Sequence, residues 1–375
     1  MLSETPPVQR FTAVFAVLQS AKYLKLAPAY SATKEERVTT PSVLDERPEL
    51  TELHSHVGGA VDAAIMWSIA HEQGIRLPSK DYWDFVDLIS VSRPDKVNNL
   101  AEYDLIFRWT ELIQSSPLAI ERSVYEIIGG AYRKSNITTL ELRFNPMKRN
   151  REGEQDLDHI ITAALRGQDR ALLEYPQVRC GLILMMDRTF SHELNAIIVE
   201  KALRYRTRGI IAVDIAGPPN PHFSYRAHQA LVDRARDAGL GVTIHTGEEG
   251  SIEDMWEVVQ YLRPHRIGHG ILSARDPRLM ERVAEAGIVL EVCPTSNLRT
   301  RAIRDLDELH HILTTLRAHG VRLTINTDGP QMLSTTLVRE YRLLLEEGIF
   351  TDADVREAIV AAYEASFVAS MPSNT

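Results

Sequence analysis

Cysteine is scarce in this sequence, with only Cys180 and Cys293 in a chain of 375 residues. The two lie far apart, and each sits inside an apolar run, as buried small hydrophobic residues do in a reducing compartment. This scarcity excludes a small fold held by disulfides and indicates a cytoplasmic protein.

Long hydrophobic runs are also missing. The most apolar stretch near the start, residues 11–30, contains Lys22 and Lys25 and lacks a small-residue cleavage site. It is therefore neither a membrane-spanning helix nor a secretory signal. No membrane partner is expected.

Positive charge is not in excess, because 42 Lys and Arg residues stand against 51 Asp and Glu, for a net charge of −9. Neither a nucleic-acid backbone nor an anionic membrane surface attracts such a chain without a local basic patch. The short basic segment 148–151 is interpreted as a solvated turn. The charge balance thus excludes nucleic acid as the main partner.

From residue 51 onward, short β-rich runs alternate with amphipathic helical stretches, which is typical of βα units and a parallel sheet. Eight strands of this kind predict an α/β fold, a (β/α)8 barrel of the TIM type. The long connection 58–137 has helical character and is expected to lie over the barrel mouth as an insertion. The candidate strands are 50–56, 139–145, 178–186, 210–216, 241–246, 266–270, 288–294 and 322–327.

The start of the chain differs from the rest. Phe11, Val14, Phe15 and Leu18 recur at helical spacing, and a polar stretch follows. Residues 1–45 are therefore interpreted as an appended helix and linker that packs on the barrel or on a second subunit, so that a homodimer is possible. Residues 46–371 form the barrel domain.

Polar side chains fall at the ends of four predicted strands, where barrels of this type assemble their sites. The first strand ends in His54-Ser55-His56, and a period of two directs both imidazoles to one side. His245, His269 and Asp328 lie at the ends of the fifth, sixth and eighth strands. Imidazoles and a carboxylate are ligands that zinc accepts, so the pattern indicates a catalytic metal site.

The motifs at these strand ends make the chain similar to the adenosine deaminase family of metal-dependent amidohydrolases, over roughly residues 45–370. The segments that carry the resemblance occur in the family's order. They are Glu52–His56, Leu140–Pro146, Val213–Gly217, His245–Glu248, Arg266–Gly270, Leu290–Asn297 and Asn326–Asp328.

The resemblance implies one Zn²⁺ per chain, whose bound water attacks a ring carbon that bears an amino group. It implies that Glu248 protonates the ring nitrogen, that His269 accepts a proton or stabilises charge, and that the backbone of Gly217 contacts the base. The implied metal ligands are His54, His56, His245 and Asp328, and Asp328 also orients the water.

Four further residues near these motifs are expected to have supporting roles. Arg143 is interpreted as an ion-pair partner of acidic neighbours at the rim. Asp214 and Glu291 could orient ligand imidazoles or anchor strand ends, and anchoring is favoured. Glu249 is interpreted as a residue that supports the site or is solvated, rather than as a second acid.

Two glycines depart from the family pattern. Gly58 and Gly329 stand where family members that act on adenosine carry acids, which there contact the ribose 5′ hydroxyl and the purine N7. Losing both contacts should weaken selectivity for adenosine. Glycine at position 58 is expected to leave room for a 5′ substituent.

The predicted function is therefore zinc-dependent hydrolytic deamination of an aminopurine nucleoside, adenosine-like and possibly 5′-modified, as in aminodeoxyfutalosine. One alternative is a deaminase of another aminated heterocycle, a free base or pterin. A second is a non-catalytic binding protein, although no ligand or acid is lost. Two-metal amidohydrolases need a lysine that strand 210–216 lacks, and the Cys-x-x-Cys zinc site of cytidine deaminases is missing.

Overall fold

The computed structural model describes residues 42–92, 96–149 and 156–368. The helix predicted within residues 11–30, with nearly all of the expected 1–45 extension, lies outside these ranges. Within them, no helix combines the length and the apolar character that crossing a bilayer would require.

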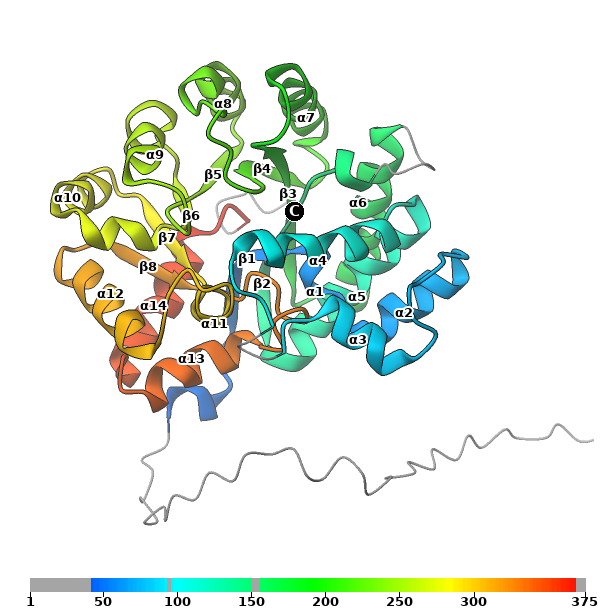
Figure 1. The fold of residues 1–375 in the computed structure, drawn as a ribbon, viewed down its shortest axis with the longest axis horizontal. Helices are drawn as coiled ribbons and strands as arrows, with labels where there is room; N and C mark the ends of the chain where they lie inside the picture. Colours follow the sequence, from blue (N-terminus) through cyan, green and yellow to red (C-terminus); the bar gives the residue numbers. More distant parts are fainter. Residues whose placement is uncertain (1–41, 93–95, 150–155, 369–375) are drawn as a thin grey trace, which may run out of the picture. The chain divides into compact units, whose positions relative to one another are not determined.

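Eight parallel strands form one sheet in the order of the sequence, β1 to β8, as Figure 1 shows. A bridge between Ser55 and Asp328 joins the last strand to the first, with Asp328 N donating to His54 O over 2.8 Å. The predicted (β/α)8 barrel is confirmed. The strands are β1 Leu50–His56, β2 Ile137–Phe144, β3 Arg179–Asp187, β4 Ile210–Ala216, β5 Gly241–Thr246, β6 Arg266–His269, β7 Val289–Val292 and β8 Arg322–Ile325.

Nearly every strand residue is buried, because helices cover the outside of the barrel and side chains fill its interior. Most of these helices begin at a side chain that accepts a hydrogen bond from the first turn, such as Ser191 before α7 and Thr351 before α14. The outer helices are α6 Leu157–Glu174, α7 His192–Tyr205, α8 Gln229–Asp237, α9 Ile252–Glu257, α10 Pro277–Glu285, α12 Leu306–Ala318, α13 Leu337–Glu346 and α14 Asp352–Ala365.

The bounds of several strands differ from the sequence prediction by one or two residues. β7 ends at Val292, because Pro294 begins the short helix α11 Pro294–Arg299 and has no N–H for a ladder. The helical segment over residues 252–262 is α-helical only to Glu257 and continues as a π-helical turn, Val258–Leu262. Apolar spacing alone does not distinguish the two kinds of turn.

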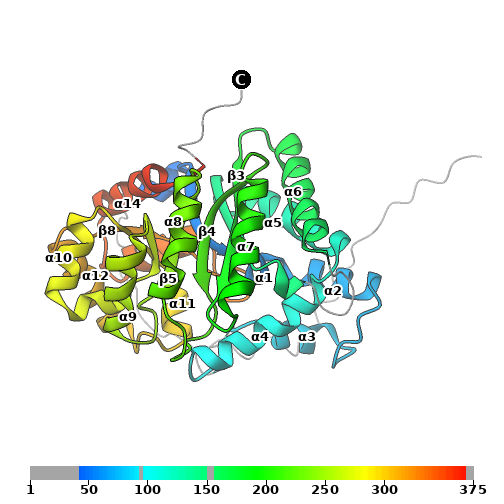
Figure 2. The same ribbon diagram turned by 90° about the horizontal axis from the view of Figure 1, so that it is seen from above.

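The predicted helical insertion follows β1 and consists of α1 Val57–Ala60, α2 Ala63–Glu72, α3 Tyr82–Ile89, α4 Leu100–Ile113 and α5 Pro117–Ser135. In Figure 1, α4 crosses in front of β1 and β2, and Figure 2 shows α1, α3 and α4 at one end of the strands. Contacts from α4 to His56 and Asp328 place it over the carboxyl ends of the strands. The insertion therefore covers the mouth of the barrel.

Candidate active site

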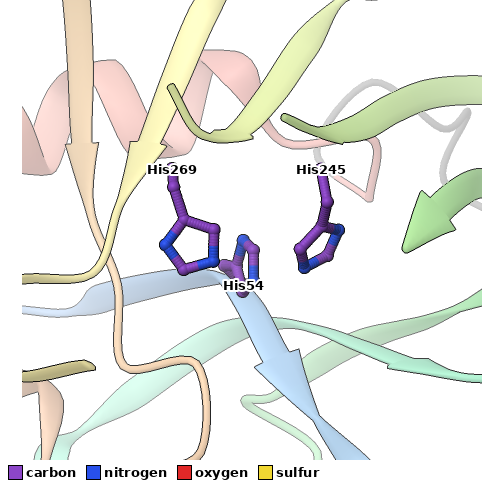
Figure 3. A group of neighbouring side chains, drawn as sticks. All are labelled: His54, His245 and His269. Carbon is purple, nitrogen blue, oxygen red and sulfur yellow. The ribbon is translucent and has the colours of Figure 1, made fainter. Parts of the chain in front are cut away.

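The histidines at the strand ends meet in one place. His54, His245 and His269 come from three different strands, and their rings lie together in Figure 3, with ligand nitrogens within 4.8 Å of one another. His54, His56 and Asp328 form a second such group. His56 Nε2 is 3.1 Å from His245 Nε2 and 3.3 Å from Asp328 Oδ1. All four predicted metal ligands thus share one small volume.

Buried carboxylates fix the orientation of two of the imidazoles. His54 Nδ1 lies 2.7 Å from Glu291 Oε2, and His245 Nδ1 lies 2.9 Å from Asp214 Oδ2. A proton on each Nδ1 leaves the Nε2 lone pair directed at the group of ligands. The structure therefore corrects the preference for a purely anchoring role of Asp214 and Glu291, because both contact a ligand imidazole.

The donor atoms fit a metal ion. His54 Nε2 is buried and has no hydrogen-bond partner among the described residues, an arrangement that is unfavourable unless a cation accepts the lone pair. Burial lowers the pKa of His54, His56 and His245 well below the usual value, so these imidazoles are neutral, the form that binds metal. Three nitrogens and a carboxylate oxygen are a donor set suited to zinc.

Arg143 holds the two carboxylates in place, as the sequence predicted. Its side chain is fully buried, and its guanidinium lies 2.9 Å from Asp214 Oδ2 and 2.7 Å from Glu291 Oε2. Burial alone would raise the pKa of Glu291, but Arg143 and Arg266 outweigh it and lower that pKa to about 2. Glu291 is therefore ionised when it holds the His54 imidazole.

Glu248 lies just after β5, beside His269 and close to the four predicted metal ligands. Asn297 Nδ2 donates to its Oε1 over 3.4 Å and Thr300 Oγ1 over 3.2 Å, while its Oε2 is 3.4 Å from His269 Nε2. Burial raises the pKa of Glu248 to about 7, and the charge of Glu249 adds to the effect. This carboxyl can therefore hold a proton near neutral pH and give it up.

His269 lies close to Glu248 and to the predicted ligands His54 and His245. Asn297 Nδ2 lies 2.9 Å from His269 Nδ1, so a donating amide places the proton of the neutral imidazole on Nε2, toward Glu248. Asp328 accepts a hydrogen bond from Ser296 Oγ over 2.6 Å at its Oδ2, which leaves Oδ1 nearest to His56 and His54. The expected catalytic residues Glu248, His269 and Asp328 are thus brought together.

The glycines predicted to contact substrate lie in three different settings. One cavity is lined by Glu248, His269 and Asp328 and also by Gly217. Gly217 has a φ of +89°, and a Cβ there would meet the Asp187 carboxylate at 2.6 Å. Gly58 also lines the cavity, but a Cβ on it would meet Phe107 Cδ1 at 2.8 Å and Arg149 Nη2 at 3.3 Å. The prediction that glycine at position 58 leaves room for a 5′ substituent is therefore wrong, because an aromatic ring and a guanidinium fill that space.

Gly329 lies against the rim, where its missing side chain lets other groups approach. A Cβ on Gly329 would meet the Tyr103 hydroxyl at 3.1 Å and Gly59 Cα at 3.4 Å. Gly59 is equally tight, since its own Cβ would meet Gly329 Cα at 2.7 Å. A Cβ at position 329 would thus require the Tyr103 hydroxyl to move by a few tenths of an ångström.

Sequence reasoning missed the cavity wall that α4 supplies. The Tyr103 hydroxyl lies 3.5 Å from Asp328 Oδ2, the Phe107 ring meets His56 edge to face, and Asp104 lines the cavity. Tyr103 and Phe107 are one helical turn apart, a spacing that equally suits a core-facing stripe. The 148–149 part of the basic segment also lines the cavity, and Arg149 is buried rather than solvated.

Comparison with known proteins agrees with this arrangement. The sequence model of the family described as Adenosine deaminase matches residues 49–374. An adenosine deaminase from Shewanella denitrificans is 30% identical over 334 residues, covering 87% of this chain and 96% of the relative.

Two solved structures share the fold. An adenine deaminase from Arthrobacter aurescens has a TM-score of 0.77 at 21% identity, covering 86% of this chain and 95% of its own. A zinc-bound amidohydrolase from Burkholderia ambifaria has a TM-score of 0.77 at 21% identity, covering 89% and 90%.

Proposed function

Because this chain belongs to the adenosine deaminase family, we propose that it deaminates an aminopurine nucleoside hydrolytically, with one zinc ion per chain, and releases ammonia. The chain is a hydrolase that acts on carbon–nitrogen bonds in cyclic amidines. One observation carries the proposal: a buried carboxyl that holds a proton near neutral pH lies beside convergent, neutral imidazoles. A reaction that protonates a ring nitrogen while water adds to the adjacent carbon needs both.

The residues that would hold the metal are His54, His56, His245 and Asp328, which supply three nitrogens and one oxygen. When bound, zinc would lower the pKa of a water and so make a nucleophile available at neutral pH. The buried carboxylates Asp214 and Glu291 fix the imidazoles in advance, so binding requires little rearrangement.

The chain's own groups move the protons. Glu248 gives its proton to the ring nitrogen as the water oxygen bonds to the carbon that bears the amino group. Asp328 is placed to accept the proton that the water loses, and His269, whose Nε2 lies 3.4 Å from Glu248, is placed to stabilise the charge that develops. Return of that proton to the amino group lets ammonia leave, and the remaining hydroxyl proton passes to Glu248 as the ring carbonyl forms. The helix α4 supplies part of the cavity wall.

The substrate is proposed to be a small aminated molecule with the size of a purine base or nucleoside. Any substituent directed at Gly58 meets the Phe107 ring and the Arg149 guanidinium, rather than a carboxylate that would accept a hydroxyl proton. This filled space favours a second candidate as well, a free aminopurine base that needs no such subsite. A fold neighbour is an adenine deaminase.

The test is an ammonia-release assay of the zinc-loaded protein with adenine, adenosine, 5′-substituted adenosines and aminated pterins. The Glu248→Gln variant should lose about 10²- to 10⁴-fold in kcat on the best substrate, because it removes the proton donor. Glu253→Gln, at an exposed position in α9, is the matched control and should retain activity.

Full activity of Glu248→Gln would refute the proposed acid. A protein that releases ammonia from none of these compounds would favour the non-catalytic reading of the fold. Metal analysis of the purified protein should give one ion per chain, and two tightly bound ions would contradict the single site.

A further inference from the structure

The helix α4 places an acidic side chain in the cavity for which the proposed reaction has no use. Asp104 lines the same cavity as Glu248 and His269, and its Oδ2 is buried. Among the residues that the structure describes, no side chain or backbone group donates a hydrogen bond to that oxygen. A buried carboxylate oxygen with no donor is unfavourable in a folded protein, so its retention calls for an explanation.

The turn of α4 that carries Asp104 is held against the strand ends. Glu249 Oε1 accepts a hydrogen bond from Leu100 N, the first residue of α4, over 3.2 Å. The Tyr103 hydroxyl lies 3.5 Å from Asp328 Oδ2. Asp104 follows Tyr103 directly, so its carboxyl is positioned by the same two attachments.

The other acids of the cavity already have partners or tasks. Glu111 lies 3.5 Å from Arg149, Glu248 is the proposed proton donor, and Asp328 belongs to the proposed metal ligands. Position 58 supplies no carboxylate, because it is glycine with Phe107 packed against it. Among the cavity-lining carboxyls that the structure describes, Asp104 is therefore the one with a buried oxygen that has no hydrogen-bond partner.

We propose that Asp104 is a specificity-determining residue that accepts a hydrogen bond from an O–H or N–H group of the substrate. This inference rests on the proposed deaminase function and names a contact within that same site. The donor is a sugar hydroxyl if the substrate is a nucleoside, and a ring N–H if it is a free base. Burial raises the pKa of Asp104 to about 7, with Glu248 adding to the effect, and a donor from the substrate offsets that burial.

The experiment compares Asp104→Asn and Asp104→Ala with the unaltered zinc-loaded protein on matched substrates. Adenosine, 2′-deoxyadenosine, 3′-deoxyadenosine and 5′-deoxyadenosine test the hydroxyls, and adenine and 9-methyladenine test the ring N–H. For the substrate with the relevant donor, KM should rise about 10- to 100-fold in Asp104→Ala, while kcat changes less than about threefold. The rise should be smaller in Asp104→Asn, because its amide oxygen still accepts a hydrogen bond. For the analogue without that donor, the variant and the unaltered protein should have nearly equal KM values.

Thermal unfolding separates this contact from a structural role. Both variants should melt at the same temperature as the unaltered protein or higher, because they remove a buried carboxyl that lacks a donor. Asp87→Asn is the matched control: it removes one acidic charge from the same insertion, at a site 59% exposed and ion-paired with Lys96. It should change neither KM nor kcat.

Equal KM values for Asp104→Ala and the unaltered protein on every substrate would overturn the inference while leaving the deaminase intact. A KM increase of the same size for analogues that lack each donor would also overturn it. If the unaltered protein releases no ammonia from any compound, the proposed function is wrong. The dissociation constants of the same compounds, measured by calorimetry, then test the contact with Asp104. Equal constants, or no binding by either protein, would then refute it.

Discussion

Glu248 and Glu249 are consecutive carboxylates with different tasks. Glu248 is buried in the cavity, whereas Glu249 accepts a hydrogen bond from the first residue of α4. Burial raises the pKa of Glu248 to about 7, and the charge of Glu249 is the next contribution. The residue that holds the covering helix thus also helps to keep the proton on its neighbour.

This pair predicts a pH profile. A general acid acts when it is protonated, so kcat/KM should fall as the pH rises through about 7, the raised pKa of Glu248. Glu249→Gln removes the neighbouring charge, lowers that pKa and should move the basic limb to lower pH, while its amide oxygen still accepts from Leu100 N. Initial rates from pH 5 to 9 check this. A limb that stays in place or moves to higher pH would contradict it.

The ion pairs of Arg143 give a second prediction, on the stability of the fold. Arg143→Met leaves the buried carboxylate of Asp214 without an arginine partner and Glu291 with Arg266 alone, so the free energy of unfolding should fall by about 3–5 kcal/mol. Urea unfolding of the two proteins measures the difference. Arg282→Met is the control, because Arg282 is 52% exposed and pairs only loosely with Glu285 at 3.8 Å, and it should change stability by less than about 0.5 kcal/mol. A loss below about 1 kcal/mol for Arg143→Met would show that the network is not needed for folding.

At the scale of helices and strands, the sequence predicted most of the barrel. β1, β4 and β5 have the predicted bounds, and helices follow the strands as the alternating pattern predicted. These elements were readable because parallel strands buried on both faces are continuous apolar runs, and outer helices show an apolar stripe. The predicted end of a strand was wrong where a single residue determined it, as at Pro294, which begins α11.

The same contrast holds for the site. His54, His56, His245 and Asp328 could be grouped in advance, because the carboxyl ends of neighbouring parallel strands must meet at one rim. Asp104 could not, because its position depends on which face of an inserted helix turns toward the barrel. Tertiary packing decides that, through contacts such as Glu249 with Leu100, and apolar spacing alone does not.

The packing of α5 on α6 predicts the effect of one glycine. A Cβ on Gly167 of α6 would meet the carbonyl oxygen of Glu121 in α5 at 2.3 Å, so Gly167→Ala should separate the helices and cost about 1–3 kcal/mol. Gly130 of α5 has no neighbour within 4 Å, so Gly130→Ala should instead stabilise by about 0.5–1 kcal/mol. Denaturant unfolding of both variants checks the opposite signs. Stabilisation by both would mean that the two helices can move apart freely.

At the scale of the whole barrel, metal removal should destabilise the fold without unfolding it. The imidazoles are held by Asp214 and Glu291, and the core is built independently of the site. A free ion at about 100 times its Kd should add about 2.7 kcal/mol to the free energy of unfolding. Thermal unfolding with and without chelator measures this, and His245→Ala is the control that should respond far less. A chelated protein that is unfolded at room temperature would contradict the prediction.

The junction that closes the barrel, where the segment after β8 meets β1, has a consequence for the order of events in folding. His54 and His56 lie on one side of the junction and Asp328 on the other, and the bridge from Ser55 to Asp328 joins nearly the whole length of the barrel chain. Contacts between such distant segments form late, because a long loop must close first. A chain emerging from the ribosome therefore has no complete set of ligands until its last strand has been made. The time course of metal uptake during refolding would measure when the first and last strands meet.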